Sequence, residues 1–146
     1  MSGAGVPRHQ PPSGDAIGRW RLRHDPSSAA LARRLVTQAL ANHPEPAPDQ
    51  VQRRALLATS DLLANAVRHA RKPVDLEVRR TDAGWLVAVT DGDTTAPKPR
   101  EIDHMAEHGR GLLIVGRSVD RTGWVPSAQG KTVWVELYEP QTAGDA

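Results

Sequence analysis

The chain has 146 residues, which suits one domain of ordinary size. Lysine and arginine total 19 and aspartate and glutamate total 17, so the formal net charge of +2 argues against a dedicated nucleic-acid-binding protein. Cysteine is absent, which excludes disulfides and thiolate metal sites and fits a cytoplasmic, reducing location, and no apolar run approaches the roughly 20 residues that span a bilayer.

The first half of the chain predicts one edge strand and two helices. Residues 1–15 are small, polar and rich in proline, so we expect them to be disordered. Residues 17–24 alternate weakly and predict an edge strand, and Asp25-Pro26 supplies an N-cap and a first helical residue for a helix that runs to about Ala41. After a proline-punctuated linker, a second helix begins at position 49 or 50 and continues to about position 70.

The second half predicts four strands, a lid and a short helix. Strict alternation over residues 74–79 predicts a half-buried strand, and the apolar run 85–91 predicts a more buried one. Residues 92–108 form a polar loop of a length that is typical of a lid or a binding loop. A short apolar helix is expected over 111–119, before a closing hairpin of residues 121–125 and 132–138.

This order of elements predicts an α+β fold. Strands joined by short turns imply a mixed, mostly antiparallel sheet, and about three helices can cover one face of it in a two-layer sandwich. The domain is expected to span residues 16–138, followed by a flexible tail over 139–146.

The second helix carries a polar stripe beside its apolar face. At about 100° per residue, Asp61 and His69 fall one turn on either side of Asn65, with Arg68 nearby. One interpretation is the ordinary polar rim of an amphipathic helix. The other is a metal–phosphate site, because an Asn amide oxygen suits Mg²⁺ and a carboxylate one turn earlier can orient or deprotonate a nucleophile beside a phosphate.

Two further segments favour the second interpretation. Asp91 ends a buried strand and precedes Gly92, so its carboxylate can accept a hydrogen bond from an exocyclic amine such as that of adenine. Gly109 and Gly111 stand directly before an apolar helix, where backbone N–H groups can bind phosphate. Taken singly, each segment is a weak signal, because a strand-end Asp is more often a turn or cap residue and a lone Gly-x-Gly is also unspecific.

In combination and in this order, four segments resemble the motifs of the GHKL ATP-binding domain, which has the Bergerat fold and occurs in histidine kinases and type II topoisomerases. Residues 61–70 resemble its N box, residues 89–93 and 109–115 its two glycine boxes, and residues 130–134 its last motif, in which Gly-Thr opens the final strand. The resemblance covers about residues 17–138. A domain of this length is most similar to the small actinobacterial regulators of the anti-sigma-factor serine/threonine kinase type.

The resemblance assigns roles to individual residues. It implies that Asn65 binds Mg²⁺, that Asp61 acts as the base or water-orienting carboxylate, and that Asp91 receives the adenine amine. The other expected cofactor-binding residues lie around the phosphates and the adenine: Arg68, His69, Gly109, Arg110, Gly111, Leu112 and Thr132. For the charged residues among them, ordinary solvated charge is the alternative.

Two departures from the family pattern bear on catalysis. Asp61 is one methylene shorter than the Glu that is usual in the N box, and Asp93 stands where the first glycine box usually has Gly. Because positioning errors of about 1 Å can cost roughly a hundredfold in rate, nucleotide binding with slow phosphoryl transfer is one expected outcome.

Three functions follow as hypotheses. The first is an ATP- and Mg²⁺-dependent protein serine/threonine kinase that binds a sigma factor, phosphorylates an anti-anti-sigma (STAS-like) partner and forms a homodimer. The second is a module that binds ATP or ADP and regulates transcription through partner binding, without phosphoryl transfer. The third is an arginine-rich interaction domain with no nucleotide. Neither a direct nucleic-acid partner nor a membrane is expected for the first two.

Overall fold

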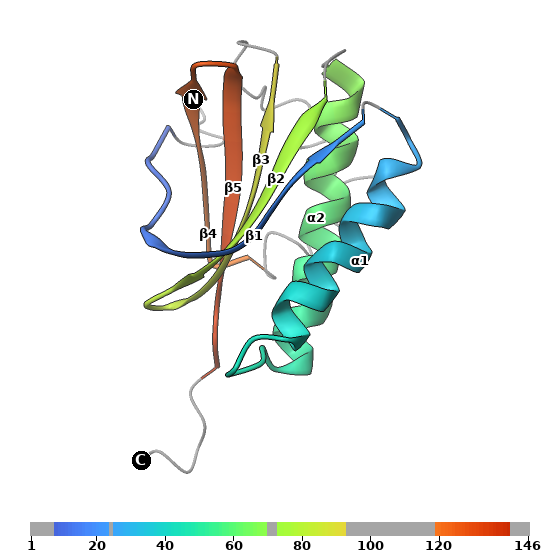
Figure 1. Cartoon of the computed structure of the whole chain (residues 1–146). Helices are drawn as coiled ribbons and strands as arrows, with labels where there is room; N and C mark the ends of the chain where they lie inside the picture. Colours follow the sequence, from blue (N-terminus) through green and yellow to red (C-terminus); the bar gives the residue numbers. More distant parts are fainter. Residues whose placement is uncertain (1–7, 24, 70–72, 93–118, 141–146) are drawn as a thin grey trace.

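The computed structural model describes residues 8–23, 25–69, 73–92 and 119–140. Along the chain they form β1 (Gly14–Leu22), α1 (Ser28–Ala41), α2 (Asp49–His69), β2 (Val74–Thr81), β3 (Gly84–Asp91), β4 (Arg121–Ser127) and β5 (Gly130–Tyr138). Both helices lie on one face of the sheet (Figure 1). The predicted α+β two-layer sandwich is therefore confirmed, with two helices in the described part; the third, expected over 111–119, lies outside the described residues.

The five strands form one open sheet in the order β1-β2-β3-β5-β4. Every pair of neighbouring strands is antiparallel, and one isolated parallel bridge joins Arg8 to Trp124. β2, β3 and β5 lie inside the sheet, and most residues of β3 and β5 are buried, whereas most residues of β1 at the edge are exposed or half-buried.

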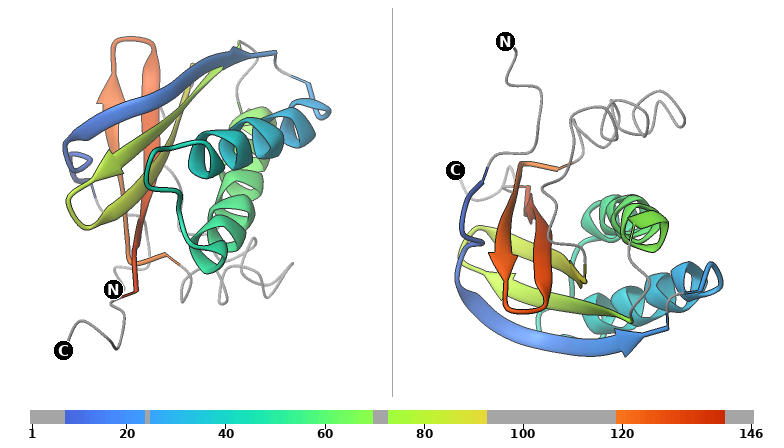
Figure 2. Two further views of the ribbon diagram at one scale, coloured as in Figure 1. Left: turned by 60° about the horizontal axis from the view of Figure 1, so that its bottom comes forward. Right: turned by 90° about the horizontal axis from the view of Figure 1, so that it is seen from above.

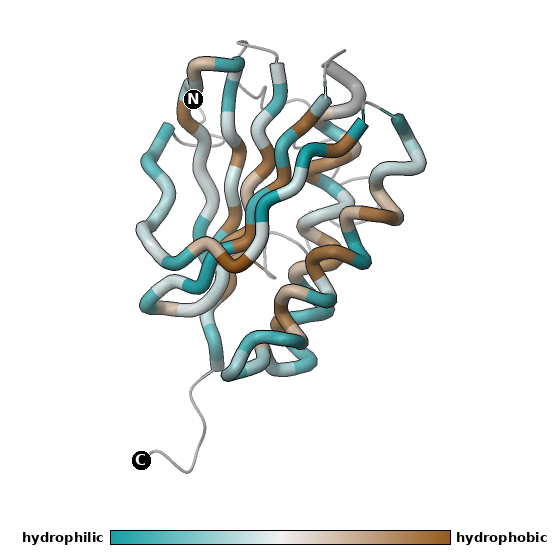
Figure 3. Tube along the Cα trace, in the orientation of Figure 1, coloured by the Kyte–Doolittle hydropathy of each residue, from teal (hydrophilic) through white to brown (hydrophobic). Residues whose placement is uncertain are grey.

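Both helices cover the sheet with small and branched side chains at helical spacing. The fully or nearly buried apolar residues of α1 and α2 recur every three or four positions: Ala32, Val36, Leu40, Val51, Ala55, Ala58, Leu62 and Ala66. Figure 3 shows hydrophobic residues along both helices and the central strands, with hydrophilic turns between them. Among the described residues, no helix has both the length and the apolar character to cross a membrane.

The start of α1 differs from the prediction. The helix begins at Ser28, after a turn, instead of using Asp25 as its N-cap. The Asp25 carboxylate accepts hydrogen bonds from the backbone N–H and the hydroxyl of Ser27, at 2.9 and 3.0 Å, and so closes that turn. The Ser28 hydroxyl donates to the Arg23 carbonyl at 2.7 Å, which ties the helix start to the end of β1.

Alternation along the strands gives the sheet two different faces. Trp85, Val87 and Val89 of β3 join the core beneath the helices. The residues between them point to the other face, where Leu86 and Ala88 form a small separate cluster with Trp134.

The N-terminal segment from Arg8 to Ser13 contacts the outer face of the sheet, which differs from the disorder predicted for residues 1–15. The indole N–H of Trp134 donates to the His9 carbonyl at 2.9 Å, and Arg79 donates to the Pro12 carbonyl at 3.2 Å. Figure 2 shows the segment on the side of the sheet away from the helices. An apolar cluster on the outer face thus provides a partner that the composition of the segment does not reveal.

Candidate functional site

Three segments that are distant in the sequence end at the same end of the molecule. The C-terminal end of α2, the C-terminal end of β3 and the turn between β4 and β5 all lie at the top of Figure 1. Asn65 belongs to the last two turns of α2, and Asp91 is the last residue of β3. Asp91 follows the alternation of Val87 and Val89, so its side chain belongs to the sheet face that the helices cover.

Asp61 and Asn65 present buried oxygen atoms that lack hydrogen-bond partners. They lie four residues apart, on one side of α2. Within the described part of the chain, neither Oδ2 of Asp61 nor Oδ1 of Asn65 has a hydrogen-bond partner. Buried polar atoms are nearly always satisfied in folded proteins, so these two exceptions, one helical turn apart, make this part of α2 a candidate ligand site.

Burial changes the acidity of Asp61. Because the surrounding protein removes water from the carboxylate, the pKa of Asp61 is raised above its ordinary value of 3.8. A raised pKa makes the ionised carboxylate a better proton acceptor, as the predicted general base requires.

Asp91 is paired with a residue that the sequence analysis did not select. Lys131 is its direct cross-strand partner on β5, and Nζ of Lys131 lies 3.2 Å from Oδ1 of Asp91. The two side chains are only 3 % and 2 % exposed, respectively. Alternation with Val133, Val135 and Leu137 was the signal that could have placed Lys131 on the helix-covered face, but only the strand register brings it to Asp91.

Gly130 brings the β4–β5 turn into contact with the end of β3. It has φ +154°, and a Cβ atom at this position would collide with the Asp91 carbonyl and with the backbone of Gly92. The absence of a side chain therefore permits the backbone approach that sets Lys131 opposite Asp91.

Asp91 also lines an open cavity of about 370 Å³. The other described residues around this cavity come from the end of β1, from the positions just before β2 and just after β3, and from the β4–β5 turn: Arg21, Pro73, Gly92, Ala128 and Gln129. Asp91 thus lies beside an open cavity, although its side chain is almost completely buried.

The structure places Thr132 on the other face of the sheet. Its hydroxyl lies 2.6 Å from the hydroxyl of Thr90, on the neighbouring strand. Because successive residues of a strand point to opposite faces, Thr132 cannot share the face of Asp91. The residue of β5 that lies beside Asp91 is Lys131.

For the remaining predicted site residues, either the side chain or the whole residue lies outside the described part of the chain. Arg68 and His69 belong to the last turn of α2, but their side chains lie outside the described set. The second glycine box, Gly109, Arg110, Gly111 and Leu112, and the lid residue Asp93 lie outside the described residues altogether.

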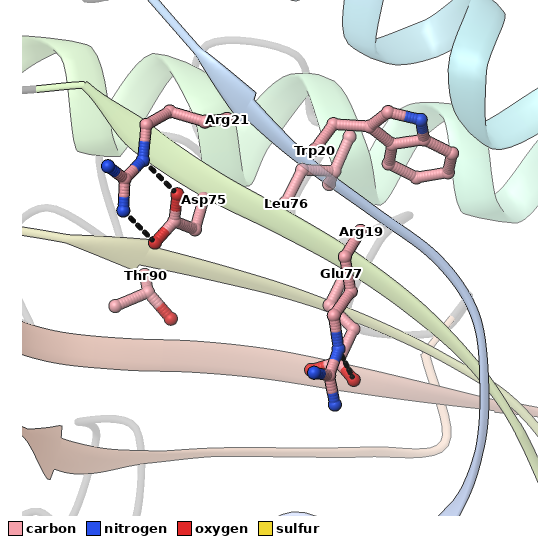
Figure 4. A pocket seen from close by; sticks show the side chains of 7 residues that line it. All are labelled: Arg19, Trp20, Arg21, Asp75, Leu76, Glu77 and Thr90. Carbon is pink, nitrogen blue, oxygen red and sulfur yellow. Dashed lines mark hydrogen bonds and ion pairs between the residues drawn. The ribbon is translucent and has the colours of Figure 1, made fainter.

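A second cavity, of about 400 Å³, lies over β1 and β2 (Figure 4). Its arginines are paired across the strands: Arg21 with Asp75 at 2.9 Å, and Arg19 with Glu77 at 3.1 Å. The neighbouring Asp75 raises the pKa of Arg21 through a hydrogen bond and its charge. Since acidic partners offset these cations, the groove is a poorer anion site than the arginine count indicates.

The polar groups at the upper end of the molecule fit a nucleotide with its metal ion. Asn65 offers a neutral oxygen of the kind that Mg²⁺ accepts, and its Oδ1 lacks a protein partner among the described residues. The described residues contain no cluster of three or more His, Asp or Glu side chains that could hold a metal ion.

The comparison with protein families agrees with this chemistry. The model of the histidine kinase-like ATPase domain matches residues 22–137, which is most of the chain. A search of curated proteins finds no significant match.

Proposed function

The chain belongs to the histidine kinase-like ATPase domain family, and on that premise we propose that it is a Mg-ATP-binding regulator of the anti-sigma-factor kinase type. The observation that carries the nucleotide site is the pair of buried, unpartnered oxygens on α2, Asp61 Oδ2 and Asn65 Oδ1. Asp91, on the same side of the sheet, supplies an acceptor for the adenine amine.

Different residues of the chain have different roles at the proposed site. Bound Mg-ATP supplies the transferable phosphoryl group. Asn65 would hold the metal ion, and Asp61 would accept the proton of the attacking hydroxyl, a role that its burial and raised pKa favour. Asp91 would accept the exocyclic amine of the base and so orient it. Gly109, Arg110, Gly111 and Leu112 are proposed to bind the phosphates, with Arg68 and His69 as their neighbours.

The first experiment is calorimetric titration with ATP and ADP, with and without Mg²⁺. We expect saturable binding that Mg²⁺ strengthens. Asn65→Ala should weaken Mg-ATP binding by at least about tenfold, as is typical when metal sites lose a supporting group. Gln50→Ala removes an exposed amide from the start of the same helix and is the matched control. Equal binding to the wild-type chain and to Asn65→Ala would overturn the metal assignment.

The kinase step needs a protein acceptor. We propose that the chain binds a sigma factor and transfers phosphate to a serine or threonine of an anti-anti-sigma (STAS-like) protein, as a cytoplasmic homodimer. Incubation with labelled Mg-ATP and candidate acceptor domains should label a hydroxyl residue of one of them. Absence of label from every acceptor that binds the chain would count against a kinase.

A second candidate is a nucleotide-dependent binding module without phosphoryl transfer. It is favoured by the short side chain of Asp61, whose buried Oδ2 reaches no described partner. Asp61→Glu discriminates between the two functions: a gain in phosphoryl transfer indicates an active but impaired kinase. Partner binding that responds to nucleotide, without transfer in either form, indicates a binding module.

A further inference from the structure

We propose that Lys131 is a second base-reading residue: Asp91 accepts the exocyclic N–H of adenine, and Lys131 Nζ donates to the adjacent ring nitrogen, N1. The inference rests on the proposed nucleotide site and goes beyond it, because it names a specificity-determining residue for the base.

Lys131 lies directly beside Asp91 in the sheet. It is the cross-strand neighbour of Asp91, 3.2 Å away, and both side chains are almost completely buried on the helix-covered face. A buried carboxylate without a cation is costly, so Lys131 stabilises Asp91 in its ionised, hydrogen-bond-accepting form.

Asp91 and Lys131 place a hydrogen-bond acceptor beside a hydrogen-bond donor. An ionised carboxylate only accepts hydrogen bonds, whereas a lysine ammonium only donates and has three N–H groups, so it can serve more than one acceptor. The Watson–Crick edge of adenine presents a donor, the N6 amine, directly beside an acceptor, N1. A carboxylate and an ammonium side by side are complementary to that edge.

The surrounding backbone fixes this arrangement. Gly130 packs against the backbone of Asp91 and Gly92, and the hydroxyls of Thr90 and Thr132 meet at 2.6 Å on the opposite face. These two contacts flank the pair and hold the register of β3 against β5. Asp91 and Gly92 also line the open cavity at this end of the sheet, so the pair lies next to that cavity.

The test separates base reading from plain charge neutralisation. Binding of ADP and of 1-deaza-ADP, which lacks N1, is measured by calorimetry with the wild-type chain, Lys131→Met and Lys131→Arg. In the wild type, loss of N1 should weaken binding by about 10- to 100-fold, the usual worth of a hydrogen bond to a charged group. Lys131→Met should bind both nucleotides equally within about twofold, and Lys131→Arg should retain part of the discrimination. The control is ADP that lacks N7. Its loss of binding affinity relative to ADP should be the same in all three proteins.

Every outcome of this experiment supports or overturns the proposed role of Lys131. Equal binding of ADP and 1-deaza-ADP by the wild-type chain, or the same loss in wild type and Lys131→Met, would overturn the role of Lys131 and leave the nucleotide site standing. Failure of the wild type to bind ATP or ADP would overturn the proposed function and this inference with it. If thermal melting shows that Lys131→Met does not fold, the wild-type ratio and Lys131→Arg decide the question.

Discussion

Single buried polar residues distinguish this chain from a plain α+β scaffold. Asp61, Asn65, Asp91 and Lys131 come from two helical turns and two strand ends, and the last three are nearly inaccessible to water. Burying such groups costs free energy unless they are paired. Asp91 and Lys131 offset that cost together, whereas the oxygens of Asp61 and Asn65 do not in the described structure.

Asp61→Asn is expected to stabilise the chain at neutral pH. Because burial raises the pKa of Asp61 above 3.8, the folded chain holds this proton more tightly than the unfolded chain. The contribution of Asp61 to stability therefore falls as the pH rises from the unfolded value through the raised, folded value. Urea unfolding from acid to neutral pH should show an advantage of Asp61→Asn that grows over this window and then levels off.

The matched control for this prediction is Asp49→Asn, which removes an exposed carboxylate from the first turn of the same helix. An advantage of Asp61→Asn that shrinks as the pH rises would contradict the sign of the effect.

A second residue-scale prediction concerns Glu136, which is buried on the outer face. Its Oε2 accepts the Thr81 hydroxyl at 2.6 Å, and Arg121 lies 3.7 Å from its Oε1. Thr81→Val leaves the buried carboxylate without this donor and should lower the free energy of unfolding by about 1–3 kcal/mol. Denaturant melts measure the loss, and the double variant Thr81→Val/Glu136→Leu should recover part of it. A double variant less stable than the sum of the single changes would contradict this account.

At the scale of elements, the β4–β5 hairpin couples fold and site. Its two-residue turn, Ala128-Gln129, carries Gly130 against the end of β3 and thereby sets the register that pairs Lys131 with Asp91. Because β5 pairs directly with β3, a displacement of this hairpin moves Lys131 relative to Asp91.

Gly130→Ala should therefore damage both stability and binding. The added methyl group collides with the Asp91 carbonyl, and the positive φ adds backbone strain of about 1–3 kcal/mol. Thermal melting measures the loss of stability, and ATP titration at a temperature where the variant is folded should show weaker binding. Gln129→Ala, in the exposed turn next to it, should stay within about 0.5 kcal/mol of the wild type. Equal stability of the two variants would refute the packing argument.

At the scale of the whole molecule, the two faces of the sheet serve different purposes. The helices cover the face that carries Asp91, while the N-terminal segment lies on the outer face, over Trp134 (Figure 2). The guanidinium groups of Arg8 and Arg121 lie 5.9 and 5.7 Å from the ring centres of Trp124 and Trp134. The segment therefore contributes to packing at a distance from the proposed nucleotide site.

Removal of residues 1–12 tests that separation. It deletes the hydrogen bond from Trp134 to His9 and the contact of Arg79 with Pro12, so we expect a loss of about 1–2 kcal/mol in unfolding free energy. Tryptophan quenching by acrylamide should rise as the outer face opens, while Mg-ATP affinity should change less than twofold. A large loss of nucleotide affinity at unchanged stability would show that the segment belongs to the site.

The sequence by itself determined most of the helices and strands and which polar side chains are candidates for a functional site. Helical spacing of small apolar residues, strict alternation over β2 and the turn residues depend on neighbours along the chain, so α2, β2, β3 and the hairpin could be predicted, as could Asp61, Asn65 and Asp91 as candidates. The start of α1 was missed because the Asp25 carboxylate closes a turn with Ser27 ahead of the helix instead of capping the first helical turn.

Only the tertiary structure decided which distant residues meet. Strand register is a non-local property in which a shift of one residue reverses every side chain, so Thr132 lies on the outer face and Lys131 faces Asp91. In the same way, only the folded sheet presents the outer apolar cluster beside the N-terminal segment, because Leu86 and Ala88 come from β3 and Trp134 from β5.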